Sequence, residues 1–337
     1  MCSKENTYDK PMTSTFQKKR SAFIDLGTNT LILLVADLFA DGHHEVIQQE
    51  FDLVRLGEGL FETGLFSEEA FARTLTAIKK YKKICVDLNC DSIRLVGTAA
   101  CRRASNTNDL ITEIKKQTGI HLEVISGDEE ARLIHAATMA DFGHLKTPRL
   151  ILDIGGGSTE FIFDLQPNLT KRKSLDFGSV KLFENTKPSD PMTETQANEL
   201  KNFVAKSTKE LLSEFNLEEK NLRPNVIATA GTPTTYLALH KQLKEYDASK
   251  IHGHNMSLHD LKQQIMRLQK MTTAERGQLN CLPPKRADII VVAGLILESV
   301  LETLQCQEFW VSDQGLRFGL VQDELLSGIA SSSLKTL

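Results

Sequence analysis

The segment Phe23-Ile-Asp-Leu-Gly-Thr-Asn-Thr30 decides the fold, because a related segment returns 128 residues later as Ile151-Leu-Asp-Ile-Gly-Gly-Gly-Ser158. Each copy holds a short apolar run, an aspartate and a turn of small or hydroxyl residues, and a second apolar run follows. A strand that ends in Asp, turns through Gly and re-enters as a strand predicts a β-hairpin. Two copies half a chain apart indicate a duplicated domain, since the repeats of solenoid proteins are much shorter.

Length and composition are those of an ordinary folded protein. The 337 residues allow two domains, and 41% hydrophobic with 25% charged residues excludes disordered and fibrous classes. The net charge of −4 disfavours a generally basic surface, so we expect no nucleic-acid polymer as partner. The longest apolar run, 289–297, is too short for a bilayer core, which needs about 20 residues. We therefore expect a soluble chain without a membrane partner.

The six cysteines are scattered and form no Cys-x-x-Cys pair, so the sequence predicts neither a zinc site nor a disulfide framework. Residues 1–20 are polar and basic and lack the apolar stretch of a secretory signal, which indicates a flexible extension. Unpaired thiols without an export signal indicate a reducing compartment, and we expect a cytoplasmic protein.

Between and after the two copies, predicted strands alternate with predicted helices, which indicates the α/β class. Asp128 is predicted to cap a helix whose first turn holds Glu129 and Glu130. The capping box Thr193-Glu-Thr-Gln196 predicts the start of a long helix that runs to about residue 215. The apolar segment 289–300 predicts a buried helix.

The small-residue loops of the two hairpins favour binding of an anion. Three consecutive glycines in 155–157 let backbone N–H groups approach a phosphate closely, and the hydroxyls of Ser158 and Thr159 add donors. The partner loop, 27–30, is similar, so two facing hairpins could grip one phosphate chain. A plain tight turn is the alternative interpretation.

Charged residues next to these loops are candidates for phosphate chemistry. Mg²⁺ usually takes one or two carboxylates plus phosphate oxygens, so we expect Asp153 as its first ligand and Asp25 as its second. Alternatively, each aspartate accepts hydrogen bonds from its turn. Arg102 and Arg317 are candidate phosphate clamps, with surface salt bridges as the alternative.

Adjacent carboxylates on a helix point about 100° apart, so only one of Glu129 and Glu130 is expected to face a given cleft. A carboxylate near a bound phosphate chain could orient and deprotonate an attacking water. The alternative is that both merely favour the positive end of the helix dipole.

Together these segments resemble the exopolyphosphatase / guanosine pentaphosphate phosphohydrolase (Ppx/GppA) family, within the superfamily of sugar kinases, Hsp70 and actin. The resemblance runs from about residue 21 to beyond residue 319 and rests on the order of eight motifs. They are Asp25-Leu-Gly-Thr-Asn-Thr30, Val54-Arg-Leu-Gly-Glu-Gly59, Gly97-Thr-Ala-Ala-Cys-Arg102, Val124-Ile-Ser-Gly-Asp-Glu-Glu-Ala-Arg132, Asp153-Ile-Gly-Gly-Gly-Ser-Thr-Glu160, Ala230-Gly-Thr232, Arg286-Ala-Asp288 and Ser312-Asp-Gln-Gly-Leu-Arg317.

The resemblance implies phosphoanhydride hydrolysis in a cleft between two RNase H-like domains. It implies that Glu130 is catalytic, that Asp153 is associated with Mg²⁺, for which Mn²⁺ could substitute, and that Glu160 also lines the site as a further candidate metal ligand. One departure is Phe318, where the family usually carries Glu. The positions that match the family's phosphate-binding residues are Gly27, Thr28, Asn29, Thr30, Arg102, Gly156, Gly157, Ser158, Thr159 and Arg317.

We expect one domain over 21–140, joined by a C-terminal helix over 313–330, and a second domain over 141–312. We predict a Mg²⁺-dependent phosphohydrolase that removes terminal phosphate from inorganic polyphosphate, with guanosine pentaphosphate as the alternative substrate. The other hypotheses are a nonhydrolytic sensor of a nucleotide or alarmone and a sugar or acetate kinase. We expect a locally basic cleft despite the overall charge, and a homodimer is one option.

Overall fold

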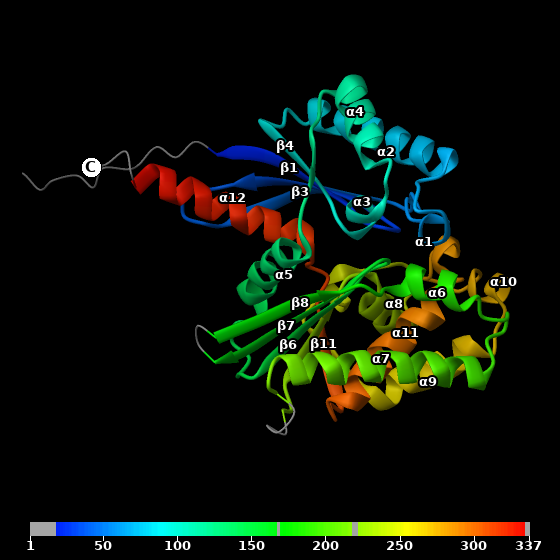
Figure 1. The fold of residues 1–337 in the computed structure, drawn as a ribbon. Helices are drawn as coiled ribbons and strands as arrows, with labels where there is room; N and C mark the ends of the chain where they lie inside the picture. Colours follow the sequence, from blue (N-terminus) through cyan, green and yellow to red (C-terminus); the bar gives the residue numbers. More distant parts are fainter. Residues whose placement is uncertain (1–17, 167–168, 218–221, 334–337) are drawn as a thin grey trace, which may run out of the picture.

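Two mixed β-sheets with their helices form the two halves of the chain in the computed structural model (Figure 1). The structure describes residues 18–166, 169–217 and 222–333. The first sheet has the strand order β3-β2-β1-β4-β5 and the second the order β10-β11-β9-β6-β7-β8. The first sheet contains β1 (Lys19–Leu26), β2 (Leu31–Leu38), β3 (His44–Asp52), β4 (Ser92–Gly97) and β5 (Leu122–Val124). The second contains β6 (Arg149–Ile154), β7 (Thr159–Gln166), β8 (Leu169–Leu175), β9 (Asn225–Thr229), β10 (His254–Ser257) and β11 (Glu308–Val311).

The two sheets share one topology, which confirms the duplication. In the first sheet β1, β2 and β3 are antiparallel neighbours, while β4 runs parallel to β1 and β5 parallel to β4. In the second, β6, β7 and β8 are antiparallel neighbours, while β9 runs parallel to β6 and β11 parallel to β9. The fold is therefore the predicted pair of RNase H-like α/β units, with β10 added at the edge of the second sheet.

The helices gather on the outer faces of the sheets and between the halves. The first half carries α1 (Leu60–Thr63), α2 (Glu68–Asp87), α3 (Ala99–Arg103) and α4 (Thr107–Thr118). The second carries α6 (Ser179–Thr186), α7 (Glu194–Glu214), α8 (Gly231–His240), α9 (Leu258–Gln269), α10 (Thr273–Arg276) and α11 (Ile290–Thr303), with 3-10 turns at Ala248–Lys250 and Pro284–Arg286. Between the sheets lie α5 (Gly127–Phe142) and α12 (Leu316–Ser333) (Figure 1).

These two helices cross between the halves. The C-terminal α12 packs against β1 and β2 of the first sheet, whereas α5 packs against β7 and β8 of the second, and the helices also pack on each other. Their apolar side chains form a core with residues from both sheets, such as Phe23, Leu34, Leu133, Ile162 and Val321. This core fixes the two halves along one side of the molecule, while the loops that follow β1 and β6 face each other. The domain boundaries stay predictions.

Two local predictions hold and two are wrong. The capping box of Thr193 and Gln196 is present, and α11 is buried as predicted. The predicted cap at Asp128 is wrong, because the Ser126 side chain accepts a hydrogen bond from the Glu129 amide and the helix begins at Gly127. Residues 19 and 20, assigned to the extension, begin β1, and residues 1–17 lie outside the described part.

Two negative findings apply to the described residues. The five cysteines among them are unpaired. None of their helices combines the length and apolar character that a bilayer crossing requires.

Candidate active site between the two halves

The two hairpin loops have the same internal hydrogen bond. In the loop between β1 and β2, the Gly27 amide donates to the Thr30 carbonyl at 2.9 Å. In the loop between β6 and β7, the Gly155 amide donates to the Ser158 carbonyl at 3.0 Å. Each sheet therefore presents an equivalent turn of small residues at the interface between the halves.

Glycines are needed in the second loop because the loops touch. A Cβ atom on Gly156 would lie 2.9 Å from the Cβ of Thr28, and one on Gly157 would lie 2.8 Å from the Thr28 hydroxyl oxygen. Such separations are too short for real Cβ contacts. We expected the glycines to admit an anion, and the structure shows that they also admit the facing loop.

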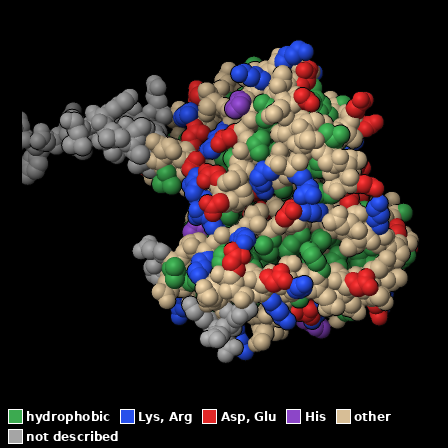
Figure 2. Space-filling model, viewed as in Figure 1, with side chains coloured by type: hydrophobic (Ala, Val, Ile, Leu, Met, Phe, Trp, Pro, Cys, Tyr) green, Lys and Arg blue, Asp and Glu red, His purple; other side chains and the backbone are tan. Residues whose placement is uncertain are grey.

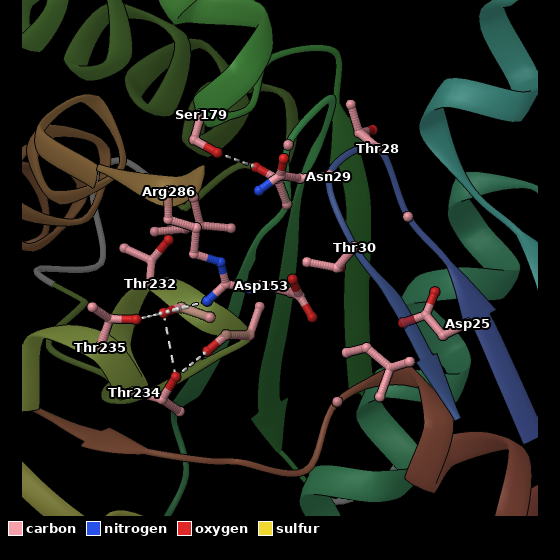
Figure 3. A pocket seen from close by; sticks show the side chains of 18 of the residues that line it. Asp25, Thr28, Asn29, Thr30, Asp153, Ser179, Thr232, Thr234, Thr235 and Arg286 are labelled. Carbon is pink, nitrogen blue, oxygen red and sulfur yellow. Dashed lines mark hydrogen bonds between the residues drawn. The ribbon is translucent and has the colours of Figure 1, made fainter. Parts of the chain in front are cut away.

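A cavity of about 830 Å³, the first cavity, opens between the halves and is lined by both loops. Asp25 of β1, Glu130 of α5 and Asp153 of β6 also line it. Figure 3 shows Asp25 and Asp153 projecting from strands of different halves, and Arg286 and threonines of α8 line the same cavity. The structure thus gathers three carboxylates from distant parts of the chain around one space.

Burial and neighbouring carboxylates raise the pKa of both aspartates. Burial, and then the nearby charge of Glu130, raises the pKa of Asp25 to about 7. Burial, followed by Glu130 and Asp25, raises the pKa of Asp153 to about 8. Oδ1 of Asp25 is buried and has no hydrogen-bond partner among the described residues. Both carboxyl groups would therefore gain from a nearby cation.

Glu130 is the acidic residue of the α5 helix start that faces the first cavity. Its side chain is buried, and Nη1 of Arg102 donates to its Oε2 at 2.7 Å. Burial raises the pKa of Glu130, while Arg102 opposes that rise. Glu129 points elsewhere and receives two hydrogen bonds from Arg132, each of 2.7 Å.

Two residues of the predicted set lie behind the second loop. Glu160 pairs with Asp153 across β6 and β7, and its carboxylate accepts 2.7 Å hydrogen bonds from Ser158 and Ser174. Thr159 is fully buried, and its hydroxyl donates to the Phe177 carbonyl at 2.7 Å. Neither side chain lines the first cavity. Both side chains support the second loop and its flanking strands through these hydrogen bonds.

The two predicted arginine clamps lie in different places. Arg317 lines the first cavity, where Nη2 donates to the Asp313 carbonyl at 2.9 Å. Arg102 lines a separate cavity behind Glu130. Phe318, the departure from the family pattern, is buried between the sheets, and its ring lies under the Arg317 guanidinium at 5.1 Å.

Sequence reasoning missed Arg286, which lines the first cavity from the second half. A Cβ atom on Gly231 would lie 2.1 Å from Nη1 of Arg286, so this glycine makes room for the guanidinium. The guanidinium also stacks on Phe51 at 5.1 Å, and burial lowers the pKa of Arg286 to about 10. The motifs around positions 231 and 286 were recognised, but nothing in the sequence showed that they meet.

The profile of the Ppx/GppA phosphatase family matches residues 35–328. The chain belongs to this family. Exopolyphosphatase 2 of Mycobacterium tuberculosis is 33% identical over 294 residues, which cover 85% of this chain and 91% of that protein. The crystal structure of an exopolyphosphatase from Cytophaga hutchinsonii superposes with a TM-score of 0.83 at 30% identity, covering 92% of this chain and 98% of the other. The Aquifex aeolicus member of the Ppx/GppA family superposes with a TM-score of 0.77 at 27% identity, covering 93% and 99%.

Membership confirms the predicted family and its phosphohydrolase class, but the expected basic cleft needs correction. In this Ppx/GppA phosphatase, the first cavity is lined by more acids than bases: Asp25, Glu50, Glu130, Asp153 and Asp313 against Arg286 and Arg317. The bases gather in a second cavity of about 840 Å³, lined by Arg102, Arg103, Arg172 and Lys173 with Asp128 and Asp176. Figure 2 shows basic and acidic side chains interspersed along the waist between the halves.

The donor set of the phosphatase fits a hard divalent cation. Within the described ranges, no group of three or more His, Cys, Asp or Glu side chains is placed to hold a metal ion by itself. Asp25 and Asp153 nevertheless offer carboxylate oxygens, one of them buried without a partner. Mg²⁺ and Mn²⁺ accept such oxygen ligands and fill their remaining positions with water and phosphate oxygens.

Proposed function

We propose that this protein is an exopolyphosphatase, which hydrolyses the terminal phosphoanhydride bond of inorganic polyphosphate with Mg²⁺ or Mn²⁺ and releases orthophosphate. The observation that carries the proposal is the buried Glu130, hydrogen-bonded to Arg102 and facing a cavity lined by both small-residue loops. Similarity to proteins named exopolyphosphatase supports the substrate class.

The residues of the first cavity have separate tasks in this proposal. The amides of loops 27–30 and 155–158 and the threonine hydroxyls of the first loop bind the terminal phosphate, and Arg286 and Arg317 contact oxygens further along the chain. Asp153 and Asp25 would hold the divalent cation. When bound, the cation would neutralise charge that develops on the transferred phosphoryl group.

Glu130 acts on the attacking water. Its carboxylate accepts a proton from a water molecule aimed at the terminal phosphorus, and Arg102 holds the carboxylate in a fixed orientation. Its raised pKa makes the carboxylate a stronger base than a solvent-exposed glutamate. Glu160 fixes the hydroxyl of Ser158 and so positions the second loop rather than the water.

The test is orthophosphate release from polyphosphate by Glu130→Gln. We expect a loss of about 100-fold or more, because the amide cannot accept the proton. The matched control is Glu129→Gln, which removes the neighbouring carboxylate that points away from the first cavity. We expect the control to stay within about threefold of wild type, and chelation of the cation to abolish activity. A folded Glu130→Gln enzyme with the wild-type rate would exclude Glu130 as the base.

Guanosine pentaphosphate is a second candidate because one part of the first cavity is apolar. Phe51, Tyr246, Leu282, Ile289 and Ala293 line it and would accommodate a nucleoside. One preparation should be assayed on polyphosphates of several lengths and on guanosine pentaphosphate. We expect faster turnover of polyphosphate. Tight binding of either compound without turnover would instead favour the sensor hypothesis.

A further inference from the structure

The second cavity begins directly behind the proposed catalytic base. Arg102 lines it while donating a hydrogen bond to Glu130, which lines the first cavity. Ala99 and Ser158 line both cavities and thus form a shared wall. A small anion close to Glu130 is therefore separated from the second cavity by a few side chains.

The stereochemistry of the proposed reaction places the product on this side. An in-line displacement puts the attacking water and the leaving chain on opposite sides of the phosphorus. Water breaks the bond from the terminal phosphorus to the bridging oxygen, and it becomes an oxygen of the orthophosphate. Its proton passes to Glu130, and the shortened chain keeps the bridging oxygen. The orthophosphate then lies next to Glu130, and a chain that stays bound blocks its path through the first cavity.

We propose that the second cavity binds the released orthophosphate and is its exit route. This inference rests on the proposed function and adds a product site to it. Four basic side chains line the second cavity against the two acidic ones of Asp128 and Asp176, whereas acids outnumber bases in the lining of the first cavity. Arg102 and Lys173 also pair with Glu130 and Glu214, which do not line the second cavity. The product thus moves from a cavity in which acidic side chains outnumber basic ones into one in which basic side chains outnumber acidic ones.

The bases of the second cavity are held by bonds that a phosphate can replace. Arg172 pairs with Asp128 at 2.6 Å, and their side chains are 33% and 67% exposed. Lys173 pairs with Glu214, and these side chains are 40% and 52% exposed. Exposed ion pairs contribute about 0–1 kcal/mol, so exchange for a doubly charged phosphate costs little. The forked guanidinium of Arg172 suits two phosphate oxygens.

The first experiment measures orthophosphate binding to the full-length Glu130→Gln protein, which should leave bound polyphosphate unhydrolysed. Orthophosphate is titrated calorimetrically with and without saturating long-chain polyphosphate and Mg²⁺. We expect one orthophosphate to occupy the phosphate-binding loops of the first cavity when polyphosphate is absent, and another to bind in the second cavity whether or not polyphosphate is present. Arg172→Gln combined with Lys173→Gln should weaken that binding at least fivefold. The control, Lys206→Gln with Lys209→Gln, removes two positive charges from exposed positions of α7 and should leave it unchanged. Binding that disappears once polyphosphate is present would overturn the proposal.

The second experiment measures steady-state kinetics of proteins in which Glu130 is unchanged. Orthophosphate should inhibit noncompetitively against long polyphosphate, and the Arg172/Lys173 double variant should relieve that inhibition. A different result would overturn the proposal: the double variant raises KM for long chains, leaves KM for tripolyphosphate unchanged and is inhibited by orthophosphate as strongly as wild type. In that case the second cavity binds phosphates of the chain, and it is not the exit of the product. Absence of polyphosphate turnover in wild type would refute the proposed function, whereas the calorimetric titration tests orthophosphate binding to the second cavity independently of turnover.

Discussion

At the scale of single residues, Asp25 and Asp153 couple the stability of this protein to pH and to divalent cations. Burial and neighbouring acids raise the pKa of Asp25 to about 7 and that of Asp153 to about 8, whereas both ionise near pH 4 in an unfolded chain. Between those values the folded state binds protons that the unfolded state has lost. The free energy of unfolding therefore falls as the pH rises through this window.

Asp153→Asn tests this coupling. In metal-free buffer at pH 8, the substitution should raise the free energy of unfolding by about 1 to 3 kcal/mol, because it removes a buried group that resists ionisation. The gain should shrink toward pH 4, and cation-dependent activity should be lost. Chemical denaturation across this pH range measures the effect. Asp109→Asn, at an exposed position of α4, should show no such gain. A less stable Asp153→Asn protein at pH 8 would contradict the argument.

Among the elements, those encoded by local pattern were predictable and those that depend on distant partners were not. The hairpins at Asp25 and Asp153 carry their own turn chemistry, and the capping box at Thr193 is complete within four residues. Strand β8 contains Lys-Arg-Lys-Ser and shows no apolar alternation, so only its pairing with β7 reveals it as a strand. The packing of α5 on β7 and β8 of the second sheet likewise depends on residues far apart in the chain.

The contact between the two hairpin loops predicts the effect of Gly156→Ala. The new Cβ would meet Thr28 at 2.9 Å and Val180 at 3.1 Å, so the loops must separate. We expect a loss of about 1 to 3 kcal/mol in the free energy of unfolding and at least a tenfold fall in activity. Gly277→Ala is the control, because its Cβ meets nothing closer than 3.4 Å. Equal effects of both substitutions on activity, with thermal denaturation measured in parallel, would contradict a specific role of this contact.

Helix α12 is tied to the first half and to α5 by Asp323. Its carboxylate accepts from Arg94 of β4 at 2.8 Å and from Arg132 of α5 at 2.6 Å. Burial alone would raise the pKa of Asp323, but the two arginines lower it, so its stabilisation is present at neutral pH and lost as the pH falls below about 4. Asp323→Asn should cost about 1 to 2 kcal/mol at pH 7, measured by urea denaturation. Glu210→Gln, in an exposed pair on α7, should cost less than about 0.5 kcal/mol. Equal costs would show that Asp323 does not tie these elements together.

At the scale of the whole molecule, the halves are joined on one side by the core of α5 and α12 and elsewhere by polar contacts. Arg55 of the first half pairs with Asp288 of the second at 2.8 Å, and the Gly59 amide donates to Glu184 at 2.8 Å. Segment 54–59 also supports the first loop, since the Gly57 amide donates to the Thr28 carbonyl at 2.8 Å. These contacts hold the first loop in register with the second half.

Asp288→Asn therefore tests whether these polar contacts contribute to closure, by which we mean holding the two halves together around bound substrate. The amide keeps the shape of the side chain but loses the ion pair with Arg55. The side chains of Arg55 and Asp288 are only 25% and 18% exposed. A loss of about 1 kcal/mol in closure should raise KM for polyphosphate roughly fivefold. We expect kcat to stay within about twofold, because no group that touches the reacting atoms changes. Glu62→Gln breaks another pair between the halves, with Lys187, but those side chains are 72% and 71% exposed, so KM should not move. Equal KM values for the two variants would mean that closure depends on the α5–α12 core and not on the polar contacts.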